Sequence, residues 1–284
     1  MNVGIICDLN YEKSAWLQNY YYAINNLFDS VKLINSYQDI DDVDIIFIGN
    51  DHYQNHLNIW RDDNFIRKCN NKKIKVFVYT SEYIQCSRFP WNLDIQKDLE
   101  KFDLLHQRMI DVNDVIKYNK KIARCGYSKH FANINKAPEK INKCIFAGTM
   151  YPHRQEAINK ISESMEIDIL PYGIYNWKDY MYILSQYRFI LSPYSNDSNT
   201  FHLKFYEALL VDSIPIHQIH SNTLEYYSKE ALYPDVIYFQ DPSEVTDKVN
   251  NFKLNRSSTK PWLEDELASF FLEHNIKIDK NEYN

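Results

Sequence analysis

Residues 188–216 read RFILSPYSNDSNTFHLKFYEALLVDSIPI, and their pattern is the main evidence for the fold that the sequence predicts. A short hydrophobic run at 188–191 is followed by a polar loop, a strongly hydrophobic segment of helical period at 199–211 and a second hydrophobic run at 213–216. A strand, a helix and a strand in this order are typical of a parallel β-α-β unit. Because ligands of such sheets collect at the carboxyl ends of the strands, we expect functional residues in and after the polar loop.

The same alternation runs through the rest of the chain. In the first half it predicts strands at 2–7, 31–34, 44–49 and 74–79 and helices at 14–28 and 62–69, with weaker elements after residue 101. In the second half it predicts strands at 143–147, 167–170 and 236–239 and helices at 154–165, 177–185, 243–252 and 262–274. The polar segment 133–142, which contains Pro138, is the best boundary between the halves. The sequence therefore predicts an α/β protein of two Rossmann-like domains that face a cleft, residues 1–137 and 138–284.

Composition narrows the class of protein. The chain has 284 residues, of which 45% are hydrophobic and 25% charged, so each half is long enough to bury a core of its own. No apolar run reaches the roughly 20 residues that cross a bilayer. The N-terminal stretch MNVGIICDLN lacks the cationic segment of a secretory signal. We therefore expect a cytoplasmic protein without a membrane span.

The cysteines, glycines and metal-ligating residues exclude further classes. The five cysteines are far apart and form no CxxC pair, so we expect neither a disulfide framework nor a zinc site. No two of the five glycines are close enough for a GxGxxG turn or a P-loop, which argues against Walker-type kinases and dinucleotide oxidoreductases. The acids Asp42 and Asp44 precede a predicted strand instead of following one, and His52 and His56 lack a third ligand. We expect no metal site.

Two charged residues interrupt the hydrophobic helix predicted at 199–211. Lys204 and Glu207 are three residues apart and so share one stripe of the helix. A buried charged pair is costly unless it has partners. Such a pair either binds a ligand or forms a self-contained ion pair at the edge of the helix, and the sequence leaves both interpretations open.

A helix of the form K/R-x-x-E-A/T-L/M followed by a hydrophobic strand such as SIPI resembles the nucleotide-binding signature of glycosyltransferases with the two-domain GT-B fold. The resemblance implies that Glu207 binds the ribose hydroxyls of a nucleoside-diphosphate sugar and that Lys204 binds its diphosphate. A carboxylate can accept hydrogen bonds from both vicinal hydroxyls, and an ammonium can neutralise a leaving diphosphate. Backbone amides at Asn199 and Thr200, where the helix begins, add donors for the phosphates.

A second block, CIFAGTMYPHRQEAI at 144–158, strengthens this resemblance. Gly148 follows a predicted strand and Arg154 opens the next helix, which is similar to the G-S/T-x-x-x-x-R pattern of many GT-B transferases. Arg154 would be a second ligand of the diphosphate, because its planar guanidinium suits phosphate oxygens. The alternative is a surface arginine paired with Glu156 or Asp179.

A third block, VFVYTSEYIQCSRFPWNL at 76–93, places Glu82 just beyond a predicted strand. Phage DNA β-glucosyltransferases have a similar run, whose acid is the catalytic base. By this resemblance Glu82 would deprotonate the acceptor hydroxyl, since burial in a cleft raises the basicity of a carboxylate. The alternative is a turn carboxylate, and Asp94 and Asp8 are competing acids.

The acceptor side has three further candidates, Asp8 and Tyr11 after the first strand and Trp91 in the third block. Trp91 suits stacking on a sugar or a base, although core packing is the usual role of such rings. Residues 117–143 carry seven lysines and one arginine against a single acid, Glu139. This basic stretch suits the phosphates of DNA, or is simply a solvated surface.

The residues and the resemblance together predict a glycosyltransferase that moves a hexose or pentose from a nucleoside-diphosphate sugar to an acceptor hydroxyl. The resemblance implies a UDP-linked sugar. No cofactor is obligatory beyond this co-substrate. The resemblance favours a hydroxymethylated pyrimidine in double-stranded phage DNA as the acceptor, within a bacterial cytoplasm. A bacterial surface glycan is the rival acceptor, favoured by a net charge of −6. A nucleotide-binding module without catalysis is the rival function. The sugar, the anomeric outcome and the oligomeric state are left open.

Overall fold

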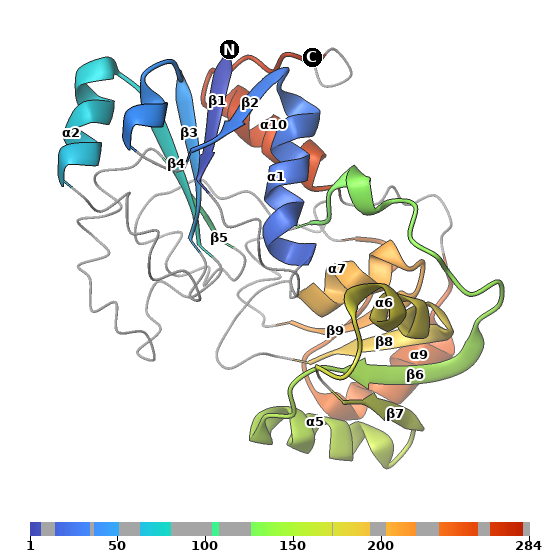
Figure 1. Ribbon diagram of the computed structural model, residues 1–284. Coiled ribbons are helices and arrows are strands. Elements are labelled where there is room, and N and C mark those ends of the chain that lie inside the picture. The colour runs from blue at the N-terminus through green and yellow to red at the C-terminus, as the bar shows by residue number, and fades with distance from the viewer. Residues whose placement is uncertain are drawn as a thin grey trace. The chain divides into compact units, whose positions relative to one another are not determined.

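A computed structural model of the chain describes residues 1–6, 15–34, 37–50, 63–80, 104–107, 126–171, 173–193, 203–219, 233–254 and 262–280. The chain divides into two compact units, and Figure 1 shows a parallel sheet with helices in each. The first unit combines Met1–His130 with Trp262–Asn284, and the second is Phe131–Pro261. The C-terminal segment therefore belongs to the unit in which the chain begins.

The first unit is built on a five-stranded sheet in the order β2-β1-β3-β4-β5, in which all neighbouring strands are parallel. The strands are β1 (Asn2–Ile6), β2 (Ser30–Leu33), β3 (Ile45–Asn50), β4 (Lys75–Thr80) and β5 (Leu104–Gln107). The helices are α1 (Ala15–Leu27), α2 (Asp63–Lys72) and α10 (Leu263–Glu273). In Figure 1, α1 and α10 lie together on one side of this sheet and α2 on the other.

Buried aromatic rings hold α10 against the first unit. The ring of Phe271 meets Phe28, just beyond α1, edge-on with 5.4 Å between the ring centroids, and it meets Phe77 of β4 at 5.6 Å. On α1, the buried residues Tyr20, Ala23, Ile24 and Leu27 recur at the spacing of one helical face. The apolar faces of α1 and α10 and one face of the sheet thus form a common core.

The second unit has a five-stranded parallel sheet in the order β10-β9-β8-β6-β7. The strands are β6 (Ile141–Ala147), β7 (Ile167–Leu170), β8 (Tyr187–Ser192), β9 (Ile214–Gln218) and β10 (Ile237–Phe239). The helices are α5 (Pro152–Ser162), α6 (Trp177–Ser185), α7 (Leu203–Leu210) and α9 (Val245–Asn251). In Figure 1, α6 and α7 cover one face of the sheet and α5 and α9 the other. Such two-sided burial is typical of parallel sheets and explains their continuous hydrophobic strands.

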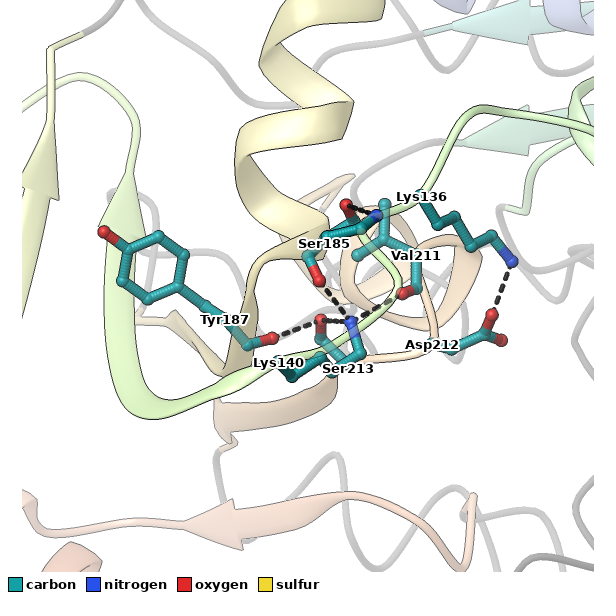
Figure 2. A network of polar contacts seen from close by, with 8 residues as sticks. Lys136, Lys140, Ser185, Tyr187, Val211, Asp212 and Ser213 are labelled. Atoms are coloured by element: carbon teal, nitrogen blue, oxygen red, sulfur yellow. Dashed lines mark hydrogen bonds and ion pairs between the residues drawn. The ribbon is translucent and has the colours of Figure 1, made fainter.

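A lysine ties the segment before β6 to the amino ends of β8 and β9 (Figure 2). Lys140 Nζ donates to the carbonyl of Ser185 at 2.7 Å, to the carbonyl of Val211 at 2.9 Å and to Ser213 Oγ at 3.0 Å. These two carbonyls lie where α6 and α7 end, where backbone acceptors lack partners within the helix. The lysine therefore caps two helices at once, at the edge of the sheet opposite the carboxyl ends of the strands.

The structure confirms the predicted α/β class and the predicted alternation of elements. The helix predicted at 177–185 has the bounds of α6, and the strand predicted at 167–170 has those of β7. Strand β5 was not predicted individually. Residues 199–202, the start of another predicted helix, lie outside the described residues, and α7 begins at Leu203.

The predicted division at residue 137 differs from the observed units in two respects, of which the first is that residues 131–137 belong to the second unit. The prediction placed residues 262–284 in the C-terminal domain, whereas the structure assigns them to the first unit. The physical reason is the apolar face of α10, which packs on α1 and β4. Among the described residues, none of the helices combines the length and the hydrophobicity that a membrane span requires.

Candidate functional site

Helix α7 carries the two charged residues that the sequence singles out. The helix packs against β8 and β9 through the buried side chains of Phe205, Tyr206 and Ala208. The ring of Phe205 meets the ring of His217, on β9, edge-on with 5.1 Å between centroids. This packing fixes the orientation of α7 and leaves Lys204 and Glu207 on the remaining stripe.

Lys204, Glu207 and Tyr180 form a closed triangle of polar contacts. Lys204 Nζ lies 2.8 Å from Glu207 Oε2, and the hydroxyl of Tyr180, from α6, donates to the same oxygen at 2.6 Å. Lys204 Nζ also donates to the Tyr180 hydroxyl and lies 4.6 Å from the centroid of the Tyr180 ring. One carboxylate oxygen thus receives both the ammonium and the phenol.

The triangle is largely withdrawn from solvent. The side chain of Glu207 is 7% exposed and that of Lys204 is 20% exposed. Removing a carboxylate from water is costly, and the two donors on its Oε2 offset that cost. The contact fits the self-contained ion pair of the alternative interpretation, and the role of the pair in binding a nucleotide stays a prediction.

The loop after β6 runs beside this triangle. A Cβ atom placed on Gly148 would lie 3.5 Å from Cε of Lys204 and 3.4 Å from the ring of Phe146. The structure therefore brings Gly148 next to Lys204, although 56 residues separate them in the sequence (204 − 148). A side chain larger than alanine at this position would occupy the space beside the ammonium.

Arg154 lies in the first turn of α5 and is bound to the loop that precedes it. Its Nη1 donates to the carbonyl of Thr149 at 2.9 Å, and its guanidinium lies 5.1 Å from the centroid of the Tyr151 ring. Asp179, one of the partners considered for it, accepts from Asn176 Nδ2 at 2.6 Å. Arg154 thus shapes the segment between Gly148 and α5, and its role toward phosphate stays a prediction.

The other predicted site residues lie outside the described residues. They are Glu82, Asp8, Tyr11, Trp91, Asn199 and Thr200. Their roles as catalytic base, acceptor contacts and helix N-terminal donors stay predictions.

Sequence reasoning missed three polar residues at or near this edge of the sheet. Nothing in the sequence singles out Tyr180, because a tyrosine on an amphipathic helix is usually interpreted as a residue that packs in the core. Ser192 ends β8 and His217 is the next-to-last residue of β9. The two are paired in register and both buried, with 3.0 Å between Ser192 Oγ and His217 Nδ1. Ser192 lies within residues 188–216 and His217 directly follows them, and their position at or near the ends of predicted strands is the signal that could have found them.

The described part of the basic stretch 117–143 is balanced by contacts within each unit. Lys136 Nζ lies 2.5 Å from Asp212 Oδ2, Lys143 Nζ lies 2.5 Å from Glu166 Oε1, and Lys129 Nζ lies 3.3 Å from Asp265 Oδ1. The hydrogen bond that Lys143 donates to Glu166 raises the pKa of Lys143 above its ordinary value. With Lys140 bound to carbonyls, the four described lysines of this stretch all have partners within their own unit. Its remaining cationic residues, 117, 120, 121 and 124, lie outside the described residues.

Comparison with known proteins establishes the fold. The chain is similar to a crystal structure of the DNA-modifying enzyme β-glucosyltransferase, determined in the presence and absence of its substrate uridine diphosphoglucose, with a TM-score of 0.50, 13% identity and 90% of each chain covered. A second similar structure is an α1,3-fucosyltransferase, with a TM-score of 0.42, 11% identity, 88% of this chain and 77% of that chain covered. No protein-family model matches the sequence, and no curated protein matches it significantly.

The likeness to the β-glucosyltransferase bears out the predicted resemblance at the level of the fold. The chain has the α/β architecture of GT-B glycosyltransferases, with two Rossmann-like units. The identity of 13% to the β-glucosyltransferase shows the fold and leaves substrate and mechanism to be argued from this chain's own residues.

Proposed function

We propose that the protein is a glycosyltransferase that takes a sugar from a nucleoside-diphosphate sugar, UDP-linked, and attaches it to a hydroxyl of a hydroxymethylated pyrimidine in DNA. The observation that carries the proposal is the Lys204–Glu207 pair on α7, one helical turn apart and 2.8 Å apart at their charged atoms. It follows the β8 strand and lies beside Gly148 in a fold similar to that of a β-glucosyltransferase.

The pair has the chemistry to bind both ends of such a donor. The carboxylate of Glu207 accepts hydrogen bonds from two vicinal ribose hydroxyls, and the ammonium of Lys204 turns from Glu207 to a diphosphate oxygen. Gly148 keeps the space beside Lys204 open, because a Cβ here would already touch the lysine. Arg154, at the start of α5, supplies a second cation for the diphosphate.

Transfer of the sugar places negative charge on the departing diphosphate, and this charge determines which residues assist the reaction. The acceptor oxygen forms a bond to the anomeric carbon of the sugar as the bond from that carbon to the diphosphate oxygen breaks. The nucleoside diphosphate leaves with the electron pair, and cations placed beside it stabilise that charge. The acceptor proton passes to a base, for which Glu82 is the candidate. Binding closes the site in many such enzymes and excludes water.

Donor binding is tested by calorimetric titration of the protein with UDP, GDP and their sugars. Glu207→Ala removes a charge-assisted contact and should weaken UDP binding about 10- to 150-fold, the equivalent of about 1.5–3 kcal/mol. Glu166→Ala is the matched control, because Glu166 is an exposed acid of the same unit and pairs with Lys143. Binding or turnover that Glu207→Ala leaves unchanged contradicts the assignment of the donor site.

The acceptor is tested by following nucleotide release with hydroxymethylated DNA and with glycans. Turnover on DNA that falls steeply with rising salt supports the DNA acceptor, because phosphate contacts release counterions. A surface glycan is the second candidate, favoured by the net charge of −6 and by the internal pairing of the described lysines. Tight nucleotide binding without release on any acceptor would favour a binding module without catalysis. As a DNA-modifying enzyme, the protein would act in the cytoplasm.

A further inference from the structure

The hydroxyl of Tyr180 connects the two charged residues of the proposed donor site. It accepts from Lys204 Nζ and donates to Glu207 Oε2 at 2.6 Å. A phenol has one proton to donate and two lone pairs to accept with, so both contacts can exist together and its contact with Glu207 does not depend on Lys204. Tyr180 belongs to α6, and the Lys204–Glu207 pair belongs to α7, a helix that packs against it.

Helix α6 gives Tyr180 a fixed position. The Asn176 side chain caps the helix by accepting from the backbone N–H of Asp179 at 3.0 Å. The next residue, Met181, and Leu184 are fully buried beneath the helix. The tyrosine is therefore presented to α7 by an element that does not depend on Lys204 or Glu207 for its own packing.

Binding of a diphosphate would draw Lys204 away from Glu207, and Tyr180 can limit the energetic cost of that separation. When Lys204 turns toward a diphosphate, Glu207 loses the cation that lies 2.8 Å from its Oε2 while its side chain is only 7% exposed. Breaking a buried ion pair on one side leaves an uncompensated charge, which is strongly unfavourable. A hydrogen bond that stays on Oε2 reduces this penalty.

We propose that Tyr180 is a positioning residue of the donor site, which holds the Glu207 carboxylate toward the ribose while Lys204 leaves it for the diphosphate. The inference rests on the proposed function of the pair. Tyr180 itself need not touch the ligand, because its effect passes through Glu207. In the unliganded protein the Lys204–Glu207 contact remains without the tyrosine, so loss of the hydroxyl should affect nucleotide binding more than folding.

Tyr180→Phe, compared with Tyr182→Phe, tests the inference by UDP titration and thermal unfolding. Tyr182 lies on the same helix and is exposed, so the control removes a hydroxyl without touching the triangle. We expect Tyr180→Phe to weaken UDP binding about tenfold or more, a change of about 1.4 kcal/mol, with little change in the unliganded melting temperature. We expect Tyr182→Phe to bind like the wild type.

A double-mutant cycle separates this role from a merely structural one. Lys204→Met removes the cation from Glu207 and leaves it the hydrogen bond from Tyr180, so Tyr180→Phe should lower the unliganded melting temperature much more in that background than in the wild type. If Tyr180→Phe folds poorly, site-specific fluorotyrosine at 180 replaces it. Its more acidic hydroxyl ionises at lower pH and then cannot donate to Glu207, so UDP binding should weaken as pH rises, unlike the same replacement at 182.

The outcomes distinguish the inference from the function on which it rests. If the wild type binds UDP and Tyr180→Phe binds it equally well, only the inference is overturned. An additive cycle, in which Tyr180→Phe costs the same with and without Lys204, also overturns it. A wild type that binds no nucleotide overturns the proposed donor site and the inference together.

Discussion

At the scale of single residues, a half-buried lysine of the second unit donates to several acceptors at once. Lys140 Nζ contacts two carbonyls and the Ser213 hydroxyl, which in turn donates to the carbonyl of Tyr187 at 2.7 Å. Beside it, Lys136 pairs with Asp212, whose φ of 59° places it in the left-handed region (Figure 2). The turn before β9 is thus held by side chains from a distant segment, which a local sequence pattern cannot show.

Lys140→Met should destabilise the second unit by about 1–3 kcal/mol. The substitution keeps most of the aliphatic volume and leaves the carbonyls of Ser185 and Val211 without their charged donor. Urea unfolding measures the loss. The control is Lys143→Met, which removes a surface ion pair with Glu166 and should cost at most about 1 kcal/mol. Equal losses for the two variants would contradict the capping role of Lys140.

Burial also controls the chemistry of a thiol in α2. Cys69 is 2% exposed, and burial is the main reason that its pKa is raised to about 11, while Lys68 lowers it slightly. We expect alkylation of native Cys69 by iodoacetamide to stay slow until the pH approaches about 11, whereas in the unfolded chain it rises near pH 9. Peptide mapping by mass spectrometry measures this rate.

The same shift makes stability depend on pH. The pKa of Cys69 is higher in the folded protein than in the unfolded chain, so the unfolded chain loses the thiol proton first as pH rises. The contribution of the buried, protonated thiol to the free energy of unfolding is therefore lost between about pH 9 and about pH 11. Rapid labelling of native Cys69 at pH 8 would show that the thiol is not buried.

At the scale of elements, the sequence predicts those helices and contacts that a local pattern of residues determines. Helix α6 was predicted with its observed bounds because its helical period is local to the sequence, and the structure adds an Asn176 cap where it begins. The i, i+3 spacing of Lys204 and Glu207 was equally visible. Tyr180 was not, because it is 24 residues from Lys204 in the chain (204 − 180) and meets it only through the packing of α6 on α7.

Gly4→Ala tests the close approach of β1 to its neighbours in the first unit. A Cβ at Gly4 would lie 2.1 Å from Ile34 Cδ1 and 3.3 Å from Val43 Cγ1, so buried side chains must move. We expect a loss of about 1–3 kcal/mol in the free energy of unfolding. At Gly148 the nearest atom lies 3.4 Å away, an ordinary contact, so Gly148→Ala should change stability by less than about 0.5 kcal/mol. The reverse order would contradict the packing described for β1.

At the scale of the whole molecule, hydrogen bonds to a buried acid attach the C-terminal helix α10 to the first unit. Glu264 of α10 is fully buried, and its Oε1 accepts from Ser128 Oγ at 2.5 Å, from the backbone N–H of Lys129 at 2.9 Å and from Asn26 Nδ2 at 2.8 Å. The apolar pattern of α10 predicts a packed helix but does not say which sheet it covers. For this reason the sequence placed it in the wrong unit.

Glu264→Leu should loosen α10 and α1 without affecting the second unit. The substitution removes the acceptor of the buried Ser128 hydroxyl and of the half-buried Lys129 N–H and Asn26 amide, at a cost of at least about 2 kcal/mol. Hydrogen exchange followed by mass spectrometry should show faster exchange in α1 and α10 and unchanged exchange in α7. Exchange that rises equally in α7 would show that the two units do not respond separately. Glu266→Leu, on the same helix, is the control.

The central claim is that a nucleoside diphosphate binds where Lys204 and Glu207 meet. A crystal structure of the protein with bound UDP tests it most directly. The account predicts that Lys204 Nζ leaves Glu207 for a diphosphate oxygen, that Glu207 accepts from the ribose hydroxyls and that the Tyr180 hydroxyl stays on Glu207 Oε2. A nucleotide bound elsewhere, with the 2.8 Å contact between Lys204 and Glu207 intact, would contradict it.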